Sequence, residues 1–301
     1  MLTAGDVLTL AELGHLRRAS SLRGVWLVLH AWLVIAAAMA LYACWPSAIT
    51  LVVAVLVIGS RQLGLAVLMH EGAHWLLFPR SRLNTEVARW LCGWPVWTDL
   101  ARYRRQHHLH HRHTQQPDDP DLPSIARYPV APRALLGAAV RDLSTVSFWT
   151  GLWTWHGWRE PRMLWPRLRG PLASNALILA GLAPAGRWDL YLLLWLLPLA
   201  TWYPLVTRLR AIAEHALLPE DDDPLRNTRT TAAGPLARAF LAPYWVNYHL
   251  EHHLLIFVPC WKLREAHALL VAKGYGPRME AAPGYGAVLA QVTGGTRARS
   301  I

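Results

Sequence analysis

The chain has 301 residues, of which 53% are apolar and only 16% charged, and its formal net charge is +11. A mean hydropathy of +0.19 is high for a soluble protein of this size, and several long apolar runs indicate a membrane protein with more than one span. The arginines flank these runs and form no single stripe, which favours positive-inside topology and contact with anionic lipid over nucleic-acid binding. Three widely separated cysteines give no support for a disulfide framework or a cysteine-based zinc site.

The first third of the chain predicts a transmembrane hairpin. Apolar runs at 24–45 and 48–69 are each long enough to span a bilayer, and the short link between them carries no charge. Because the segment before the first run is basic, we expect the N-terminus, and the end of the second run at His70, on the cytoplasmic side. Arg61 and Gln62 are costly in lipid, so we expect them to face the protein interior or to lie near the interface.

The rest of the chain predicts a polar segment, an interfacial segment and a second hairpin. Residues 134–158 are half-apolar and are interpreted as one or two interfacial helices. Apolar runs at 172–185 and 190–207 form the second hairpin, which returns to the cytoplasm at Arg208 and Arg210. The expected fold is all-α: a single membrane domain over 1–301, with four spans and a cytoplasmic helical cap. The cap is expected to comprise residues 70–133 and 208–301.

Nine of the 15 histidines form a pattern of three clusters and one further residue. The first cluster has two histidines four residues apart, and the other two are H-x-x-H-H clusters. Positions i, i+3 and i+4 share one face of a helix, so each cluster can direct its imidazoles into one cavity. The predicted topology also puts every cluster on the same side of the membrane. The nine are His70, His74, His107, His110, His111, His215, His249, His252 and His253.

This number of imidazoles indicates two metal ions. Imidazole binds iron, zinc, copper and nickel, and nine ligands are too many for one ion with four to six positions. A pair of irons with neutral ligands is strongly oxidising once O2 binds, which is the chemistry needed to break an unactivated C–H bond. His108 and His113 lie off the ligand spacing, and we expect supporting or surface roles for them. The isolated His15, His30, His156 and His267 are interpreted as ordinary histidines.

Zinc is the main competing interpretation. Residues 70–74 match H-E-x-x-H, in which two histidines bind zinc and the glutamate activates water. An intramembrane zinc protease would suit the apolar runs, but it leaves seven histidines of the pattern unexplained. A metal transporter is a further alternative, and it should carry more polar residues within its spans than this chain does.

The order of the clusters resembles the membrane fatty acid desaturase and hydroxylase superfamily over about residues 60–260. The matching segments are His70–His74, His107–Thr114 with Asp119–Pro120–Asp121, and Asn247–His253. The resemblance implies a four-helix transmembrane bundle whose cytoplasmic cap holds two irons. It also implies that the eight cluster histidines are ligands, and that His215 is the additional histidine that family members carry after their last span.

The resemblance further implies an O2-dependent reaction that needs two electrons per turnover. The leading expectation is desaturation of a fatty acyl group, as a lipid or a thioester. The alternative is a hydroxylase or ketolase acting on a carotenoid or sphingoid substrate. No segment typical of an electron carrier is visible, so a separate donor of the ferredoxin, rubredoxin or cytochrome b5 type is expected. Arg102, Arg104, Arg105 and Arg112 would suit an acidic donor, lipid headgroups or the acidic loop at 118–121.

Some polar residues are expected to orient metal-bound histidines through the second ring nitrogen. The candidates include Asp118, Asp119 and Asp121, for which a surface or helix-capping role is the default. Glu71, Glu214 and Glu251 each adjoin a predicted ligand and are exempt from that default. The predicted supporting residues are Glu71, Asp121, Glu214, Asn247 and Glu251. The expected location is the inner or plasma membrane, with both termini in the cytoplasm.

Overall fold

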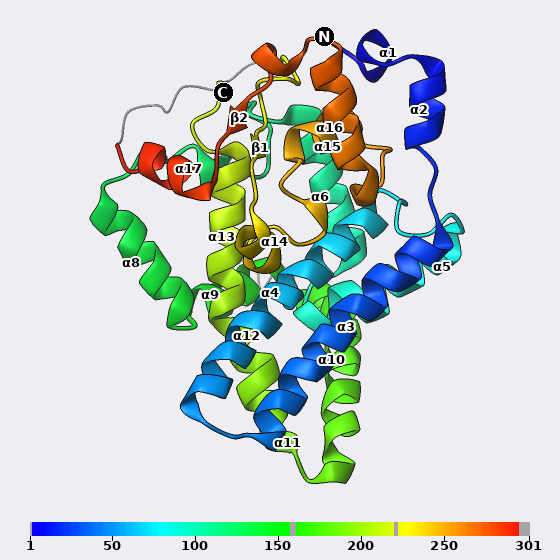
Figure 1. The fold of residues 1–301 in the computed structure, drawn as a ribbon. Coiled ribbons are helices and arrows are strands. Elements are labelled where there is room, and N and C mark those ends of the chain that lie inside the picture. The colour runs from blue at the N-terminus through cyan, green and yellow to red at the C-terminus, as the bar shows by residue number, and fades with distance from the viewer. Residues whose placement is uncertain (1, 157–160, 220–221, 295–301) are drawn as a thin grey trace. The chain divides into compact units, whose positions relative to one another are not determined.

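Two long helices, α3 (Ser21–Cys44) and α4 (Ala48–Ala73), run side by side in the computed structural model, which describes residues 2–156, 161–219 and 222–294 (Figure 1). Pro46 disfavours continuation of α3, and the Ser47 hydroxyl then accepts a hydrogen bond from the Thr50 amide at 3.2 Å, which caps α4. The predicted runs at 24–45 and 48–69 are therefore confirmed as helices. The second continues one turn beyond His70, so the first histidine cluster lies at a helix end.

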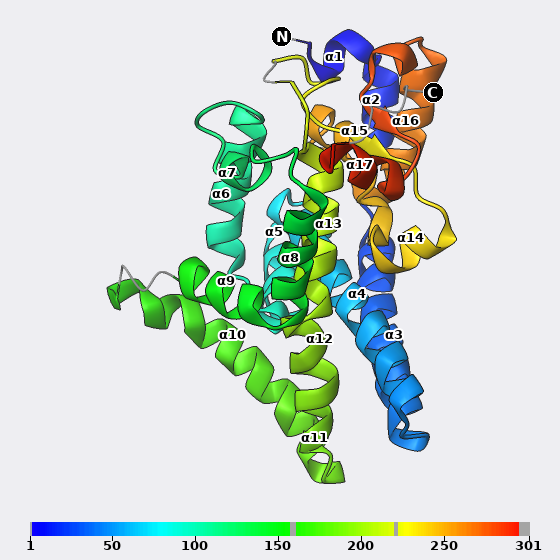
Figure 2. The same ribbon diagram turned by 90° about the vertical axis from the view of Figure 1, so that its left-hand side faces the viewer.

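Three helical segments of the described chain are long and apolar enough to cross a membrane, namely Ser21–Cys44, Ala48–Ala73 and Trp188–His215. The predicted span at 172–185 is not among them. It belongs to α10 (Pro161–Leu182), whose first half carries Arg162, Arg167 and Arg169. Its apolar part, 172–182, has a helical length of only about 16 Å, against a hydrocarbon thickness of about 30 Å. Figure 2 shows α10 turning into α11 (Trp188–Tyr191).

The contacts divide the chain into two compact units, one of which is made of Ser21–Tyr103 and Gly137–Thr207. Apart from α3, α4, α10 and α11, it contains most of the segment 134–158, which was interpreted as one or two interfacial helices. The structure has two helices there, separated by a break at Thr145. Its remaining elements are α5 (Ser81–Val87), the π-helix η1 (Ala88–Gly93), η2 (Trp94–Val96), most of α8 (Pro132–Leu143), α9 (Val146–His156), η3 (Ala183–Ala185), the π-helix η4 (Leu192–Leu196) and α12 (Leu197–Ala200).

The other unit is made of Met1–Ser20, Arg104–Leu136 and Arg208–Ile301. Among its described residues, it departs from the all-α expectation only by a parallel pair of two-residue strands, β1 (Thr230–Thr231) and β2 (Ala281–Ala282). Its helices are α1 (Ala4–Val7), α2 (Leu10–Leu16), most of α6 (Leu100–His113), α7 (Leu122–Ile125), part of α13 (Trp202–His215), α14 (Pro235–Phe240), η5 (Pro243–Trp245), α15 (His249–Leu254), η6 (Cys260–Lys262), α16 (Leu263–Ala272), η7 (Gly276–Arg278) and α17 (Tyr285–Val292).

A small apolar core fixes the helix that ends at His215. Ile212 lies on α13 and Ala216 directly follows this helix. Both are buried with Tyr128, Val288 and Val292. Burial of apolar surface of this kind stabilises a fold by about 25 cal/mol per Å². The C-terminal helix α17 therefore packs on the segment that presents His215, although the two are about 70 residues apart in sequence.

The polar residues inside the second apolar run face protein, as predicted. Gln62 is fully buried, and its amide donates a hydrogen bond to the backbone oxygen of Trp195 at 2.8 Å. Arg61 is also buried. A second buried amide, Asn175, accepts hydrogen bonds from the Tyr191 hydroxyl and the Trp195 indole at 3.0 Å each. The amides of Gln62 and Asn175 thus bond within the protein and do not face lipid.

Gly72, inside the first histidine cluster, is required by a close helix contact. A Cβ atom placed on Gly72 would lie 2.2 Å from the Ala88 Cβ at the start of η1. Replacing Gly72 with alanine should therefore lower stability by about 1–3 kcal/mol, because neither backbone can move without distorting its helix. A thermal melt of the purified protein measures the loss. The double variant Gly72→Ala, Ala88→Gly should regain most of it, and failure of this rescue would argue against the contact.

Candidate metal centre

Helix α6 presents three histidines on one face. Asp99 begins the helix by accepting a hydrogen bond from the Arg102 amide at 2.8 Å, which satisfies one of the free N–H groups of the first turn. His107, His110 and His111 follow with the i, i+3, i+4 spacing. Their rings divide between two groups of histidines. His107 and His111 belong to one group, and His110 belongs to the other.

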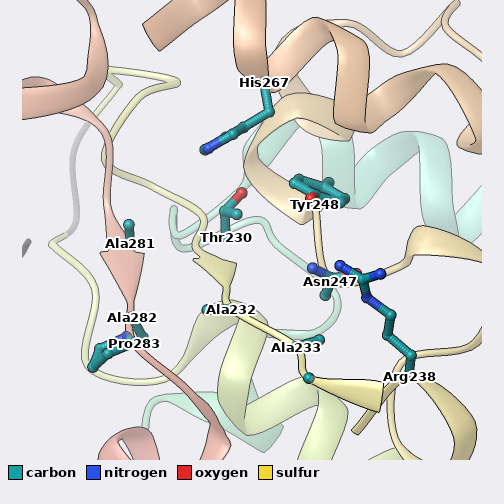
Figure 3. Close-up of a pocket in the computed structure, with 11 residues that line it drawn as sticks. Thr230, Ala232, Ala233, Arg238, Asn247, Tyr248, His267, Ala281, Ala282 and Pro283 are labelled. Carbon is teal, nitrogen blue, oxygen red and sulfur yellow. The ribbon is translucent and has the colours of Figure 1, made fainter.

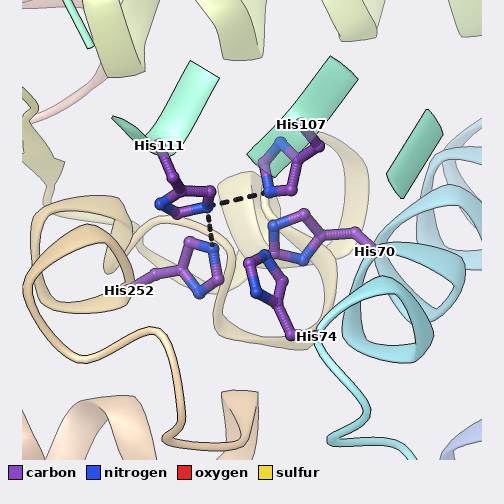
Figure 4. A group of neighbouring side chains, drawn as sticks. All are labelled: His70, His74, His107, His111 and His252. Atoms are coloured by element: carbon purple, nitrogen blue, oxygen red, sulfur yellow. Dashed lines mark hydrogen bonds between the residues drawn. The ribbon is translucent and has the colours of Figure 1, made fainter. Parts of the chain in front are cut away.

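The first group contains His107, His111 and His252, which lie in the unit made of Met1–Ser20, Arg104–Leu136 and Arg208–Ile301. The Nε2 atom of His111 lies 2.9 Å from His107 Nε2 and 3.1 Å from His252 Nε2. Figure 4 draws these three rings with the two contacts, together with His70 and His74. His252 comes from α15, so residues about 140 positions apart in sequence meet here.

In the other unit, His70 and His74 form a pair at the end of α4. Their ring centroids lie 4.9 Å apart in an edge-to-face arrangement, and His70 is buried. Asn84 fixes the end of the helix by donating to the Gly72 backbone oxygen at 2.8 Å and accepting from the Phe78 amide at 3.2 Å. The helix continues through His70 and ends at His74, so both imidazoles are held by one rigid element.

The second group contains His110, His215, His249 and His253, which belong to three different helices. One nitrogen from each lies within 4.8 Å of the others. His249 Nε2 and His215 Nε2 are 2.9 Å apart. Burial lowers the pKa of His249 and His253 well below that of a free histidine, so both are neutral at physiological pH. Neutral imidazole is the form that binds metal ions.

Two rings of this second group use their outer nitrogen for hydrogen bonds and leave the inner one available. His110 Nδ1 lies 2.8 Å from Asp119 Oδ1, and His253 Nδ1 lies 3.3 Å from the Thr114 hydroxyl. His253 Nε2 is buried and has no hydrogen-bond partner among the described residues. A buried nitrogen of this kind is costly unless a ligand or ion satisfies it.

The nitrogen–nitrogen distances fit a cation better than a shared proton. His111 Nε2 contacts two other ring nitrogens, and a single ring nitrogen has either one N–H to donate or one lone pair. The residues present therefore fit metal cations that are each held by several imidazoles.

The carboxylate that supports His110 is Asp119 and not Asp121, which was the predicted supporting residue. The Asp119 side chain is fully buried, and it also accepts hydrogen bonds from the amides of Gln115 at 3.1 Å and Asp121 at 2.9 Å. Asp121 lies 3.8 Å from His110 and its side chain is 59% exposed. Asp121 follows Pro120 in a turn, and the Asp121 backbone amide donates a hydrogen bond to Asp119. The Asp121 carboxylate itself points outward.

The other predicted supporting residues occupy different positions. Glu71 lies 3.6 Å from His70 Nδ1, and Glu214 lies 3.7 Å from His249 Nδ1 while it accepts from Arg210 at 2.8 Å. Asn247 donates to the Thr231 backbone oxygen at 3.1 Å, and its own amide oxygen has no partner in the described chain. Glu251 is buried but bonds to residues outside both histidine groups.

Comparison with known proteins identifies the family. The sequence profile described as "Fatty acid desaturase" matches residues 45–281, which include all nine histidines. The chain belongs to the fatty acid desaturase family. It is thus an oxidoreductase, and its histidine groups are those typical of the family's di-iron site. Membership leaves the zinc protease and transporter interpretations without support.

Two relatives of this desaturase-family chain have assigned activities. It is 27% identical over 239 residues to dihydrorhizobitoxine desaturase of Bradyrhizobium elkanii, a match that covers 72% of this chain and 66% of that protein. It is 30% identical over 275 residues to the beta-carotene ketolase of Paracoccus sp. (strain PC1), covering 87% of this chain and 93% of the ketolase. The two activities differ in substrate and product.

His267 is isolated in the sequence and was interpreted as an ordinary histidine, but it supports one of the histidine clusters. His267 Nδ1 lies 2.6 Å from the buried carboxylate of Glu251, which also accepts from the Thr230 hydroxyl. Glu251 adjoins His252 on α15, so these two partners hold the helix that carries three histidines. The other isolated histidines differ: His15 bonds to Glu265 at 2.8 Å on the surface, and the side chain of His156 lies outside the described residues.

The His267 contact predicts a pH dependence of stability. The hydrogen bond that His267 donates to Glu251 raises the pKa of His267 above its ordinary value of about 6.5. A raised pKa contributes stability below the unfolded value and loses it as pH rises through the folded value. Replacing His267 with phenylalanine should therefore lower the melting temperature more at pH 6 than at pH 9. An equal loss at both would show that only packing is affected.

Proposed function

We propose that the chain is an integral membrane, O2-dependent oxidase whose two irons are held by nine histidines. The observation that carries this proposal is the division of seven buried or half-buried imidazoles into two groups with inward-facing nitrogens. His110, His215, His249 and His253 would hold one iron, and His107, His111 and His252 the other. The family's cluster order and the rigid pair at the end of α4 support His70 and His74 as the remaining ligands of that second iron.

Two bound irons supplied with O2 and two electrons provide an oxidant able to break an unactivated C–H bond. The protein's own residues keep the imidazoles neutral and oriented. Asp119 holds His110 in one tautomer and Thr114 orients His253, which leaves Nε2 of each ring for the metal. Burial of both groups excludes bulk water from the oxidant.

The proposed topology retains both termini and all histidine groups in the cytoplasm. Arg17, Arg18 and Arg23 precede the first span, and Arg208 and Arg210 lie near the end of the segment Trp188–His215. The four-span arrangement requires the apolar half of α10, 172–182, to enter the membrane beside α11 and α12 as the second hairpin. The location is then the inner or plasma membrane.

The proposed reaction is desaturation of a fatty acyl group, as a lipid or thioester. The desaturase family and the dihydrorhizobitoxine desaturase relative support removal of two hydrogens. A ketolase or hydroxylase acting on a carotenoid or sphingoid substrate is the second candidate, because the match to the beta-carotene ketolase covers 93% of that protein. The electron donor is a separate ferredoxin, rubredoxin or cytochrome b5 type of protein. Arg102, Arg104, Arg105 and Arg112 on α6 are the proposed contacts.

Mass spectrometry of cell lipids and carotenoids, with and without expression of the chain, distinguishes the candidates. Loss of two hydrogen atoms from an acyl chain supports the leading proposal. Gain of one oxygen atom supports hydroxylation, and gain of oxygen with loss of two hydrogens supports the ketolase. A product that forms equally with the wild-type chain and with His110→Ala would contradict all three, because the iron ligands would then be dispensable.

A further inference from the structure

A pocket of about 440 Å³ lies in the unit that contains β1 and β2. Figure 3 shows Ala281 and Ala282 along one side and Tyr248 and Arg238 along the other, with His267 above. None of the nine histidines lines it, but Asn247 and Tyr248 immediately precede α15. Its volume falls within the range of about 300–1,000 Å³ that is typical of small-molecule sites.

The polar side of the pocket is cationic. Arg238 lies on α14, is exposed, and has no carboxylate within ion-pair distance in the described chain. No aspartate or glutamate occurs among the described residues that line the pocket. A guanidinium group without a protein partner on a concave surface favours a carboxylate or phosphate, to which it donates two parallel hydrogen bonds.

His267 is a further polar residue of the pocket lining. Its Nδ1 is committed to the Glu251 carboxylate at 2.6 Å, and a carboxylate only accepts hydrogen bonds. The ring therefore carries its proton on Nδ1 and presents Nε2 elsewhere, and the side chain is 33% exposed while it lines the pocket. Pairing with Glu251 raises the pKa of His267, which favours the form with N–H groups on both nitrogens.

The remaining wall is small and apolar. Ala232, Ala233 and Gly234 follow β1, and Ala281 and Ala282 form β2. This wall can make apolar contacts with the carbon atoms of a ligand, and it carries no charge. The cavity is thus larger than a bare inorganic ion needs, and its two sides suit a molecule with one anionic end and a short organic portion.

We propose that this pocket binds a small phosphate ester, with Arg238 as the donor to its oxyanion and with His267 and the alanines lining the rest of the site. The site is separate from the oxidation centre and does not depend on the function proposed above. Its occupant contacts His267 and Thr230, the two residues that hold Glu251 on α15. The ester is either a soluble metabolite or the headgroup of a phospholipid.

Two titrations of the detergent-purified full chain test the proposal. Glycerol 3-phosphate is titrated by isothermal titration calorimetry, and phosphatidylglycerol is titrated by native mass spectrometry. The wild type should bind at least one of the two saturably, and Arg238→Gln should bind it at least about tenfold more weakly, as expected for loss of a charge-assisted hydrogen bond. Arg264→Gln is the matched control, because Arg264 is exposed in the same unit and does not line the pocket.

Each outcome is decisive. Saturable, Arg238-dependent binding of glycerol 3-phosphate identifies a soluble ligand, and such binding of phosphatidylglycerol alone identifies a headgroup site. Saturable binding of neither probe overturns the proposal, as does an equal loss in Arg238→Gln and Arg264→Gln. The readout is binding, so it gives the same answer whether or not the chain proves to be a di-iron oxidase.

Discussion

Replacing His110 with alanine is expected to abolish activity and to remove one of two irons. His110 is buried in the group with His215, His249 and His253, and Asp119 holds its outer nitrogen at 2.8 Å. Loss of a residue that only supports a metal ligand costs about 10–100-fold, so loss of the ligand itself should cost more than about 100-fold. Product formation by mass spectrometry and iron content of the purified variant measure the two effects.

The matched control is His108→Ala. His108 lies on the same helix but is exposed and off the ligand spacing. It should keep wild-type iron content and most of the activity. Circular dichroism of both variants separates loss of metal from loss of folding. A folded His110→Ala chain that retains full iron and activity would contradict the assignment of this group.

Asp119→Asn is expected to lower activity and iron retention by about 10–100-fold. The fully buried Asp119 carboxylate accepts from His110 and from two backbone amides. Asparagine has nearly the same shape, but its amide group can take the place of one accepting oxygen, which disturbs the tautomer of His110. Iron retention during dialysis against a chelator reports this change without relying on turnover.

Asp121→Asn serves as the comparison for Asp119→Asn. The Asp121 side chain is 59% exposed and lies 3.8 Å from His110, beyond hydrogen-bonding distance. We therefore expect an effect of less than about threefold, as for most surface substitutions. A larger loss for Asp121→Asn than for Asp119→Asn would reverse the roles that the geometry assigns.

The histidine pattern was predictable because ligand spacing is a local property of helices. The H-x-x-H-H segments at 107–111 and 249–253 both fall on helices, and His70 and His74 lie at a helix end. The division between groups was not predictable. It depends on which histidine of α6 contacts which histidines of α13 and α15, and tertiary packing sets those contacts.

Hydropathy correctly predicted the first hairpin and the last long span, but it predicted a span at 172–185 where the structure has part of α10. The window at 172–185 detected an apolar stretch, whereas the helix begins earlier at Pro161, and its first half carries three arginines and two internal prolines. Helix continuity through Pro166 and Pro171 runs against local propensity. Within this unit, Asn175 bonds to Tyr191 and Trp195, a tertiary contact that sequence does not reveal.

The supporting residues were the least predictable part of the site. Asp119 and Asp121 are indistinguishable in sequence, and only the turn at Pro120 decides which carboxylate is buried. His267 is isolated in sequence, yet it bonds to Glu251 across the gap between α15 and α16. Contacts between distant residues of this kind have no signature in composition or periodicity.

Metal analysis of the purified full-length chain tests the central claim most directly. The protein is expressed with iron and zinc both supplied, and the bound metals are quantified against protein concentration. The nine-histidine, two-group site predicts about two irons per chain, with little zinc. About one zinc per chain and no iron would contradict it, because the H-E-x-x-H segment would then act alone as a zinc site.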